Sequence, residues 1–325
     1  MRKRSKLLIG LALVAAAVWA NNTSLLAPSI DGETRLLAHR GVHQDFDRTG
    51  LTNETCTAER ILPPVAPEIE NTIASMRAAF EMGAGVVELD VHPTTDGGFA
   101  VFHDWTLDCR TNGSGKTRDH DMAYLTSLDI GYGYTFDGGR TFPLRGKGVG
   151  LMPTLAEVMR EFPDGRFLVN FKSRDEEEGR RFAELMEANP SWRPAIWGVY
   201  GGEEPTAVAV ELMPDMIGVT PKSAKSCLAG YLALGWSGYV PAACRRAIVL
   251  VPIDVAPWLW GWPDRFTARM HRAGSEVVLR GPIAGEAAGD GIDTQQLAAR
   301  VPPGFAGLVW TNNIAAVRPT LDAMR

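Results

Sequence analysis

Three segments in the first third of the chain place polar side chains directly after apolar runs. They are residues 36–41 (LLAHRG), 86–97 (VVELDVHPTTDG) and 99–104 (FAVFHD). In a strand, alternate side chains share a side, so Glu88 and Asp90 face the same way. Two such carboxylates repel each other unless a positive charge lies between them. A divalent cation such as Mg²⁺ or Ca²⁺ suits these oxygen ligands, and arginine or lysine side chains are the alternative partners.

The histidines of the first and third segments supply groups for proton transfer. His39 and His103 each follow a predicted strand, and a pair of histidines can act as general base and general acid. Arg40 and Lys172, which ends the run FLVNFK, add positive charge over the same face. Phosphate is the natural partner of a metal ion combined with arginine and lysine. The pattern therefore predicts phosphoryl transfer to water or to a neighbouring hydroxyl.

Short strand-like runs separated by single helices must position these groups. This rhythm predicts parallel strands joined by crossovers, and about eight strands favour a (β/α)8 TIM barrel over a doubly wound open sheet. Expected strands are 35–41, 86–91, 99–103, 167–172, 195–200, 216–220, 247–253, 276–280 and 305–311. Expected helices are 71–82, 155–161, 176–188, 205–212, 264–273 and 294–299.

Two connections are too long to be simple turns. Residues 43–70 follow the first strand, and residues 104–152 follow the third. Loops that follow barrel strands lie on the catalytic face, where long loops are often functional. We expect one domain over residues 34–325, with an inserted segment after the third strand at about residues 105–152.

The order and spacing of five motifs resemble a known family. LLAHRG, ENT at 70–72, ELDV, TTDG and VFHD together look like the glycerophosphodiester phosphodiesterases, and the resemblance is strong over residues 36–172. It implies a barrel with an insertion and a divalent metal. It also implies hydrolysis of glycerophosphodiesters to glycerol 3-phosphate and an alcohol.

The resemblance also implies roles for individual residues. It gives acid and base roles to His39 and His103, phosphate contacts to Arg40 and Lys172, and metal ligation to Glu88 and Asp90. Glu70 is implied as a further active-site carboxylate, either a metal ligand or an orienting group. The sequence departs from the family at Asn170, where a carboxylate is usual. An amide oxygen still ligates Mg²⁺ or Ca²⁺, so Asn170 stays among the expected metal ligands.

Other departures leave the substrate open. Residues 44–69 are longer than usual, and 310–313 (WTNN) replace a Thr-Asp pair. Within enzymes, the alternatives are a lysophospholipase D or a sphingomyelinase D-like phosphodiesterase. From another class, the alternative is an exported, non-catalytic binding protein for phosphorylated ligands, with Asn170 as the lesion.

Composition and the N-terminus bear on partners and location. The 325 residues carry a formal net charge of −5, which argues against nucleic acid or a general anionic membrane as partner but allows a small local anion site. We expect a small-molecule phosphodiester substrate. A basic segment precedes the apolar run 7–20, which is typical of a signal peptide and, with about 14 residues, short for a membrane span. An uncleaved signal anchor is the alternative, and both place the protein in the periplasm or outside the cell.

Cysteine and tryptophan add two further expectations. The four cysteines allow three pairings, and we favour Cys56 with Cys109 and Cys227 with Cys244 over four free thiols. Either disulfide suits an exported protein. For the tryptophan-rich stretch 255–263 (VAPWLWGWP), we expect the rings to pack within the loop or against the core. The alternative is an exposed loop that binds a lipid-like or membrane-surface ligand.

Overall fold

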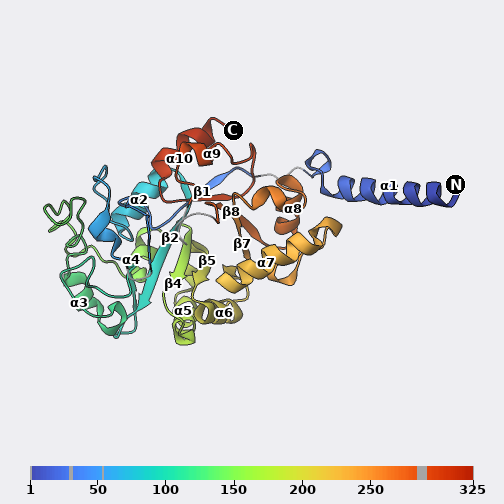
Figure 1. Ribbon diagram of the computed structural model, residues 1–325. Helices are drawn as coiled ribbons and strands as arrows, with labels where there is room; N and C mark the ends of the chain where they lie inside the picture. The colour runs from blue at the N-terminus through green and yellow to red at the C-terminus, as the bar shows by residue number, and fades with distance from the viewer. Residues whose placement is uncertain (1, 29–31, 53–54, 284–290, 325) are drawn as a thin grey trace.

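Eight parallel strands form a nearly closed barrel in the computed structural model, which describes residues 2–28, 32–52, 55–283 and 291–324 (Figure 1). The order around the barrel is β6-β5-β4-β2-β1-β9-β8-β7, and an isolated bridge between Gly218 and Ala247 joins β6 to the start of β7. The strands are β1 (Arg35–Ala38), β2 (Ala84–Pro93), β3 (Phe99–Val101), β4 (Phe167–Phe171), β5 (Ile196–Gly201), β6 (Gly218–Val219), β7 (Ile248–Pro252), β8 (Glu276–Arg280) and β9 (Leu308–Thr311). The expected (β/α)8 barrel is confirmed.

Most helices alternate with these strands and cover the outside of the barrel, whereas the first precedes the barrel and the third lies in the inserted segment (Figure 1). They are α1 (Arg2–Asn22), α2 (Ile73–Glu81), α3 (Met122–Ser127), α4 (Leu155–Glu161), α5 (Glu176–Ala188), α6 (Glu203–Leu212), α7 (Pro221–Leu234), α8 (Asp264–Arg272), α9 (Gln295–Ala298) and α10 (Ile314–Asp322). Capping boxes begin α2, α4 and α7 at Thr72, Thr154 and Thr220. Such caps satisfy amide groups that would otherwise be unpaired at the first turn.

Alternation along β2 separates the outer core from the inside of the barrel. Val87, Leu89 and Val91 pack in the layer between strands and helices. Val86 faces inward with apolar side chains of neighbouring strands, which fill the barrel interior. By the same alternation, Glu88 and Asp90 face inward nearer the carboxyl end of the strand. The apolar side chains inside the barrel therefore lie next to Glu88 and Asp90, on the side toward the amino ends of the strands.

The third strand differs from the prediction. β3 runs antiparallel to β2, with Val91 opposite Val101 and Pro93 opposite Phe99, so it is the return arm of a hairpin and no barrel strand. The reason is that β2 continues past the barrel rim and the turn at residues 94–98 sends the chain straight back. The inserted segment follows β3 and packs its own buried cluster against residues 58–69.

Both favoured cysteine pairs are joined in the structure. Cys56 and Cys109 link the long first loop to the insertion, with 5.5 Å between their Cα atoms. Cys227 and Cys244 link α7 to the segment before β7, with 4.8 Å between Cα atoms. The first disulfide therefore ties together two loops on the face of the barrel that carries the motif residues.

The first helix stands apart from the barrel. α1 projects away from the rest of the molecule and meets it only at its carboxyl end (Figure 1). Over the residues that the structure describes, no helix has the length and apolarity needed to cross a membrane.

Candidate active site

A tight turn after β1 places His39 and Arg40 at the barrel mouth. Arg40 has φ +58°, an uncommon value for a residue with a side chain, and Gly41 has φ +75°. A Cβ on Gly41 would lie within 2.8 Å of the backbone of Ser75, so only glycine fits there. The turn points the backbone N–H of Arg40 at Oε2 of Glu88, 3.0 Å away.

His39 is oriented by the segment after β9. The side-chain nitrogen of Asn312 donates to Asp293, so its Oδ1 accepts from Nδ1–H of His39 at 2.6 Å. This arrangement leaves Nε2 of His39 without hydrogen and directed toward Glu88, 3.7 Å from Oε2. Burial, followed by the charge of Arg40, holds the pKa of His39 well below its usual value. His39 is therefore neutral near pH 7.

The ENT motif connects the first loop, the site and α2. Glu70 is buried, Asn71 adopts φ +59°, and Thr72 caps α2. The Asn71 amide donates to Oδ2 of Asp90 at 2.9 Å and accepts from the Asp90 backbone N–H at 3.1 Å. The motif thus fixes Asp90 on the neighbouring strand at both its backbone and its carboxylate.

Glu88 and Asp90 are both fully buried, but their pKa values shift in opposite directions. Burial, together with the charge of Asp90, raises the pKa of Glu88 to about 8. The Tyr200 hydroxyl donates to its Oε1 at 2.6 Å. Burial also acts to raise the pKa of Asp90, but Lys172 and the other nearby cations outweigh it and hold that pKa well below the usual range. Of the two carboxylates, Glu88 is therefore the one that takes up a proton more readily.

Strand β4 brings two more predicted residues to Asp90. Asn170 pairs in register with Asp90 across the sheet and donates its amide N–H to Oδ1 at 2.8 Å. Nζ of Lys172 lies 3.3 Å from the same oxygen, and Nε of Arg40 lies 3.4 Å from Oδ2. Asp90 is thus the point at which Arg40, Asn170 and Lys172 meet.

His103 reaches the site on the hairpin and is held by the insertion. Its Nδ1–H donates to Oδ1 of Asp104 at 2.6 Å, which leaves Nε2 free for chemistry. Burial, then the charges of Arg40 and Lys172, lowers the pKa of His103 to about 4. His103 is therefore neutral near pH 7 in the ligand-free site.

Arg110 joins the two halves of the site, and sequence reasoning missed it. Its Nε donates to Oδ2 of Asp104 at 2.8 Å, and its Nη1 donates to Oε2 of Glu70 at 3.1 Å. Glu70 in turn accepts from Nη1 of Arg40 at 3.1 Å through its other oxygen. A continuous chain of hydrogen bonds therefore runs from His103 through Asp104, Arg110 and Glu70 to Arg40. Both Glu70 oxygens are held by arginines, which favours an orienting role for Glu70 over metal ligation.

Arg110 is itself fixed by the surrounding loops. It is 2% exposed, and it donates to the Tyr134 hydroxyl and to Oγ1 of Thr57, both at 2.6 Å. Thr57 and Arg110 are the chain neighbours of Cys56 and Cys109, so the disulfide closes the same contact. An arginine in a loop carries no periodic signal, and nothing in the sequence separates it from surface arginines.

Tyr200 and Asn312 were missed for a different reason. Each stands at the end of a predicted strand, and the rule that selected His39 and His103 also applies to them. Among the described residues, no three His, Cys, Asp or Glu side chains are grouped as metal ligands. Asn170, the expected third ligand, turns its amide nitrogen toward Asp90 and its oxygen toward Gly201. The structure thus brings together all eight expected site residues, namely His39, Arg40, Glu70, Glu88, Asp90, His103, Asn170 and Lys172.

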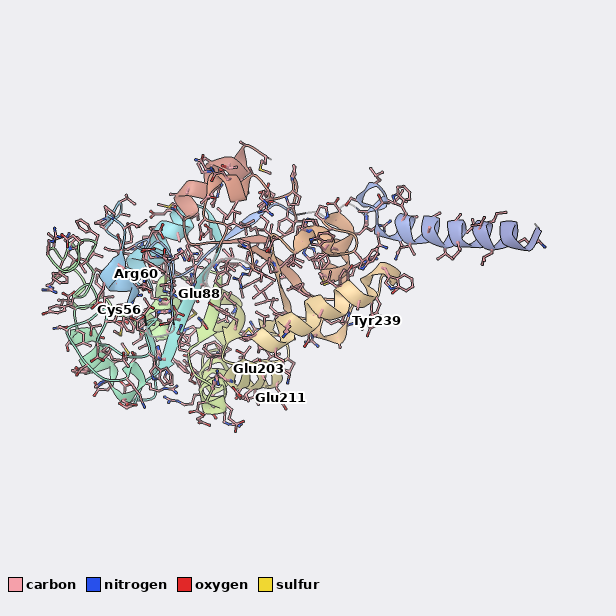
Figure 2. The ribbon with its side chains drawn as sticks, in the orientation of Figure 1. Cys56, Arg60, Glu88, Glu203, Glu211 and Tyr239 are labelled. Atoms are coloured by element: carbon pink, nitrogen blue, oxygen red, sulfur yellow. A yellow bond between two sulfur atoms is a disulfide. The ribbon has the colours of Figure 1, made fainter. Side chains whose placement is uncertain are left out.

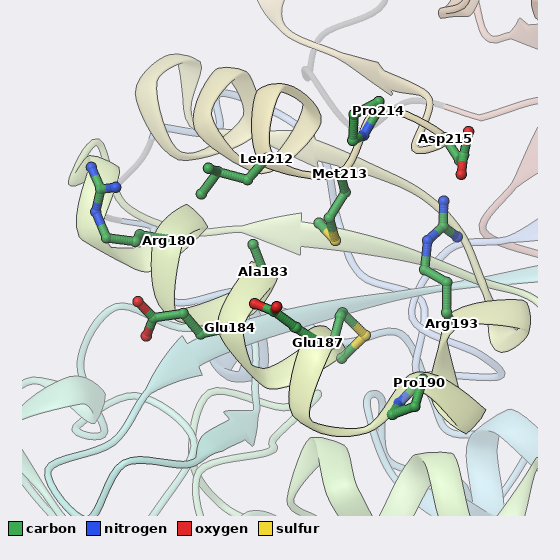
Figure 3. Close-up of a pocket in the computed structure, with 11 residues that line it drawn as sticks. Arg180, Ala183, Glu184, Glu187, Pro190, Arg193, Leu212, Met213, Pro214 and Asp215 are labelled. Atoms are coloured by element: carbon green, nitrogen blue, oxygen red, sulfur yellow. The ribbon is translucent and has the colours of Figure 1, made fainter.

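A separate hollow lies outside the barrel. It has a volume of about 570 Å³ and lies between α5 and α6, where Glu184, Glu187, Arg193 and Asp215 line it (Figure 3). None of the residues above contributes to it. Glu88, by contrast, lies on β2 within the barrel (Figure 2). The chemistry predicted from the motifs belongs to the barrel mouth.

Comparison with known proteins identifies the family. Residues 39–198 match the model of the glycerophosphoryl diester phosphodiesterase family. The chain is 41% identical over 105 residues to a glycerophosphodiester phosphodiesterase of Caldanaerobacter subterraneus, which covers 32% of this chain and 39% of the relative. It is 38% identical over 110 residues to one of Bacillus subtilis, covering 33% and 36%. The matched parts are thus under two fifths of those relatives' lengths.

Solved structures agree in fold. A glycerophosphodiester phosphodiesterase of Agrobacterium tumefaciens superimposes with a TM-score of 0.57 at 20% identity, over 88% of this chain and 99% of that one. A phosphodiesterase of Oleispira antarctica, in complex with the product sn-glycerol-3-phosphate, gives 0.54 at 19% identity, over 89% and 97%. With the matched segment carrying all of the expected site residues, the chain belongs to the glycerophosphoryl diester phosphodiesterase family.

Proposed function

We propose that this protein hydrolyses glycerophosphodiesters to glycerol 3-phosphate and an alcohol. The observation that carries the proposal is the meeting of two neutral histidines, two cationic side chains and a buried carboxylate pair at one barrel mouth. The names of the matched relatives and the product bound to the Oleispira antarctica enzyme support the same substrate class. The alcohol part of the substrate is left to experiment.

In this proposal, the two histidines move the protons. Their Nδ1 atoms are engaged by Asn312 and Asp104, so both Nε2 atoms are open. One histidine deprotonates the attacking oxygen, which belongs to water or to the substrate's glycerol hydroxyl. The other takes up a proton from solvent at Nε2, which the negative charge of the bound phosphodiester favours, and gives it to the leaving alcohol. Arg40 and Lys172, which contact Asp90 at 3.3 to 3.4 Å in this structure, orient the phosphate oxygens.

A divalent cation, Mg²⁺ or Ca²⁺, fits the charges of the site. Four carboxylates face three permanent cations, with the histidines neutral; the carboxylates are Glu70, Glu88, Asp90 and Asp104, and the cations are Arg40, Arg110 and Lys172. A bound divalent ion would leave one net positive charge, which matches the single negative charge of a phosphodiester. Burial and the charge of Asp90 raise the pKa of Glu88 to about 8, as expected where two buried carboxylates face the same way. Glu88 and Asp90 would hold the divalent ion, with Asn170 as a third ligand once its amide is turned to present the oxygen, and the ion would polarise the phosphate.

A substrate panel tests the proposal. Glycerophosphocholine, glycerophosphoethanolamine, lysophosphatidylcholine and sphingomyelin would each be incubated with the protein and Mg²⁺ or Ca²⁺. We expect release of glycerol 3-phosphate from the first two and loss of release with chelator. Turnover of only the last two would favour the lysophospholipase D or sphingomyelinase D alternative, and binding without turnover would favour a binding protein.

Two variants test the histidines directly. His39→Ala and His103→Ala should each lower kcat by two to four orders of magnitude, the usual contribution of a general acid or base. Glu184→Gln, in the hollow outside the barrel, is the matched control and should keep full activity. Full activity of both histidine variants would refute the acid and base roles.

We further propose a periplasmic or extracellular location, with residues 34–325 as a single barrel domain. Two disulfides on separate parts of the barrel support export, because such bonds form and persist in oxidising compartments. Mass spectrometry of the mature protein would show whether residues 1–20 are removed. A chain recovered only from the reducing cytoplasm would contradict the proposal.

A further inference from the structure

Four arginines line an open hollow beside the base of α1. The hollow has a volume of about 660 Å³ and is formed by Arg245, Arg246, Arg269 and Arg272 together with Tyr239. Tyr239 lies beyond α7, toward the side from which α1 projects (Figure 2). Within the described ranges, none of these arginines pairs with a carboxylate. In a chain with net charge −5, this is a local concentration of unpaired positive charge.

Arg269 fixes α1 against this hollow. It is only 5% exposed, and its guanidinium donates to the backbone oxygen of Asn21 at 2.7 Å and to Oδ1 of Asn22 at 3.0 Å. The Asn22 amide donates in turn to the backbone oxygen of Trp236 at 2.8 Å. The carboxyl end of α1 is therefore built into the barrel surface at this place.

The exposed part of α1 is apolar on every side. Its large side chains are 58% to 67% exposed; they are Leu7, Leu8, Ile9, Leu11, Leu13 and Val14. A helix that is apolar all round is normally buried, either in a protein core or in a bilayer. No part of the barrel that the structure describes covers this one (Figure 1).

Large aromatic and aliphatic side chains surround the junction of α1 and the barrel. Trp19 is 61% exposed, Leu25 83%, Trp236 45% and Tyr239 47%. Residues 255–263, whose rings were expected to pack, also expose an aromatic side chain. Trp258 is 74% exposed, whereas Trp262 packs against the core. Amphipathic tryptophan and tyrosine rings are typical of the level at which a membrane meets water.

We propose that this face docks on a bilayer of anionic lipids. In this arrangement α1 lies in the apolar layer and the aromatic rings lie at the headgroup level. Arg245, Arg246 and Arg272, the exposed arginines of the hollow, bind headgroup phosphates, while the buried Arg269 holds α1 in place. Guanidinium groups bind phosphate through paired hydrogen bonds, and basic groups near an anionic surface are attracted to it. A protein partner would explain the apolar helix, but not the unpaired arginines directly beside it. The expectation of membrane contact by the N-terminal segment alone is thereby extended to the barrel.

Vesicle flotation of the full chain tests this inference, and its outcome does not depend on turnover. Vesicles of phosphatidylcholine alone would be compared with vesicles that also contain phosphatidylglycerol. We expect at least tenfold tighter binding to the anionic vesicles, and this preference should weaken as salt is added. Equal binding to both vesicle types, or binding to neither, would overturn the proposal.

A pair of matched double variants separates the hollow from net charge. Arg245→Gln with Arg272→Gln removes two exposed arginines of the hollow. Arg140→Gln with Arg180→Gln removes two exposed arginines elsewhere. We expect the first pair to lose the preference for anionic vesicles and the second to keep it. If both pairs lose it equally, or if the first pair keeps it, the hollow is not the phosphate site. Thermal unfolding of each variant verifies that it is folded.

Discussion

Replacing Arg110 by methionine should damage both stability and turnover. Methionine keeps an unbranched apolar stem but removes the guanidinium and its four hydrogen bonds, to Asp104, Glu70, Tyr134 and Thr57. Two carboxylates then lose a buried cationic partner. Breaking a buried ion pair on one side usually costs about 3 to 5 kcal/mol. Glu70 keeps Arg40 and Asp104 keeps His103, so we expect the lower end, about 3 kcal/mol.

The effect on turnover follows from the position of His103. Without Arg110, Asp104 is no longer fixed from the insertion side, and the imidazole that it orients is free to shift. We expect kcat to fall by about two orders of magnitude, which is the lower end of a general acid's contribution. Arg40 is also less constrained, since Glu70 has lost its second arginine, so KM should rise by a smaller factor.

Urea unfolding and steady-state kinetics measure the two effects. Arg118→Met is the matched control, because Arg118 is also an arginine of the insertion and pairs with Glu178 at 3.1 Å away from the His103 network. It should lose stability but keep kcat. A double-mutant cycle of Arg110→Met with Asp104→Asn should show a coupling of at least about 0.5 kcal/mol.

Three results would refute this reasoning. One is a loss of unfolding free energy below about 1 kcal/mol, well under the range for a broken buried ion pair. Another is an unchanged kcat in a folded Arg110→Met protein. The last is strict additivity in the cycle, since Arg110 would then act on turnover without Asp104.

Three further predictions concern the metal, the disulfides and pH. Asn170→Asp adds a carboxylate beside Asp90, so calorimetry should show at least about tenfold tighter binding of Mg²⁺ or Ca²⁺, and unchanged affinity would exclude Asn170 from the ligand set. Removing the Cys56–Cys109 bond, with sequence separation 53, should cost roughly 4 kcal/mol and also lower kcat. Removing the Cys227–Cys244 bond, with separation 17, should cost roughly 3 kcal/mol without affecting kcat, so equal kcat losses would contradict the link to Arg110. His103 has a folded pKa of about 4, below its unfolded value of about 6.5. The unfolded chain therefore binds more protons between these values, so stability should fall as the pH drops from about 6.5 to about 4, and His103→Asn should show a shallower decline in urea unfolding.

Much of the site was predictable because the ends of parallel strands meet. The barrel rhythm alone places His39, Glu88, Asp90 and Lys172 at one mouth, and the structure has them within contact of one another. Alternation correctly placed both carboxylates on one side of β2. These predictions rest on local periodicity, which a single sequence carries.

Other features depend on contacts between distant segments. The direction of β3 is set by how far β2 extends beyond the barrel rim. The residue pattern at 99–103 does not indicate whether this strand pairs in parallel or antiparallel. Helix α7 was missed because glycine and small residues weaken its periodicity, although Thr220 and Pro221 form a recognisable start. Arg110 acquires its partners only when the insertion folds over the first loop, joined by Cys56 and Cys109.

The hairpin formed by β2 and β3 divides the site between two supports. His39 follows β1, a strand of the ring that forms the barrel. His103 follows β3, the returning strand of the hairpin, which lies outside that ring beside the inserted segment (about residues 105–152), here called the cap. Substitutions or length changes in the cap alter one wall of the site while the ring stays intact. Diversification among relatives is therefore expected to concentrate on the wall that carries His103, while the wall that carries His39 and the two carboxylates of β2 stays the same.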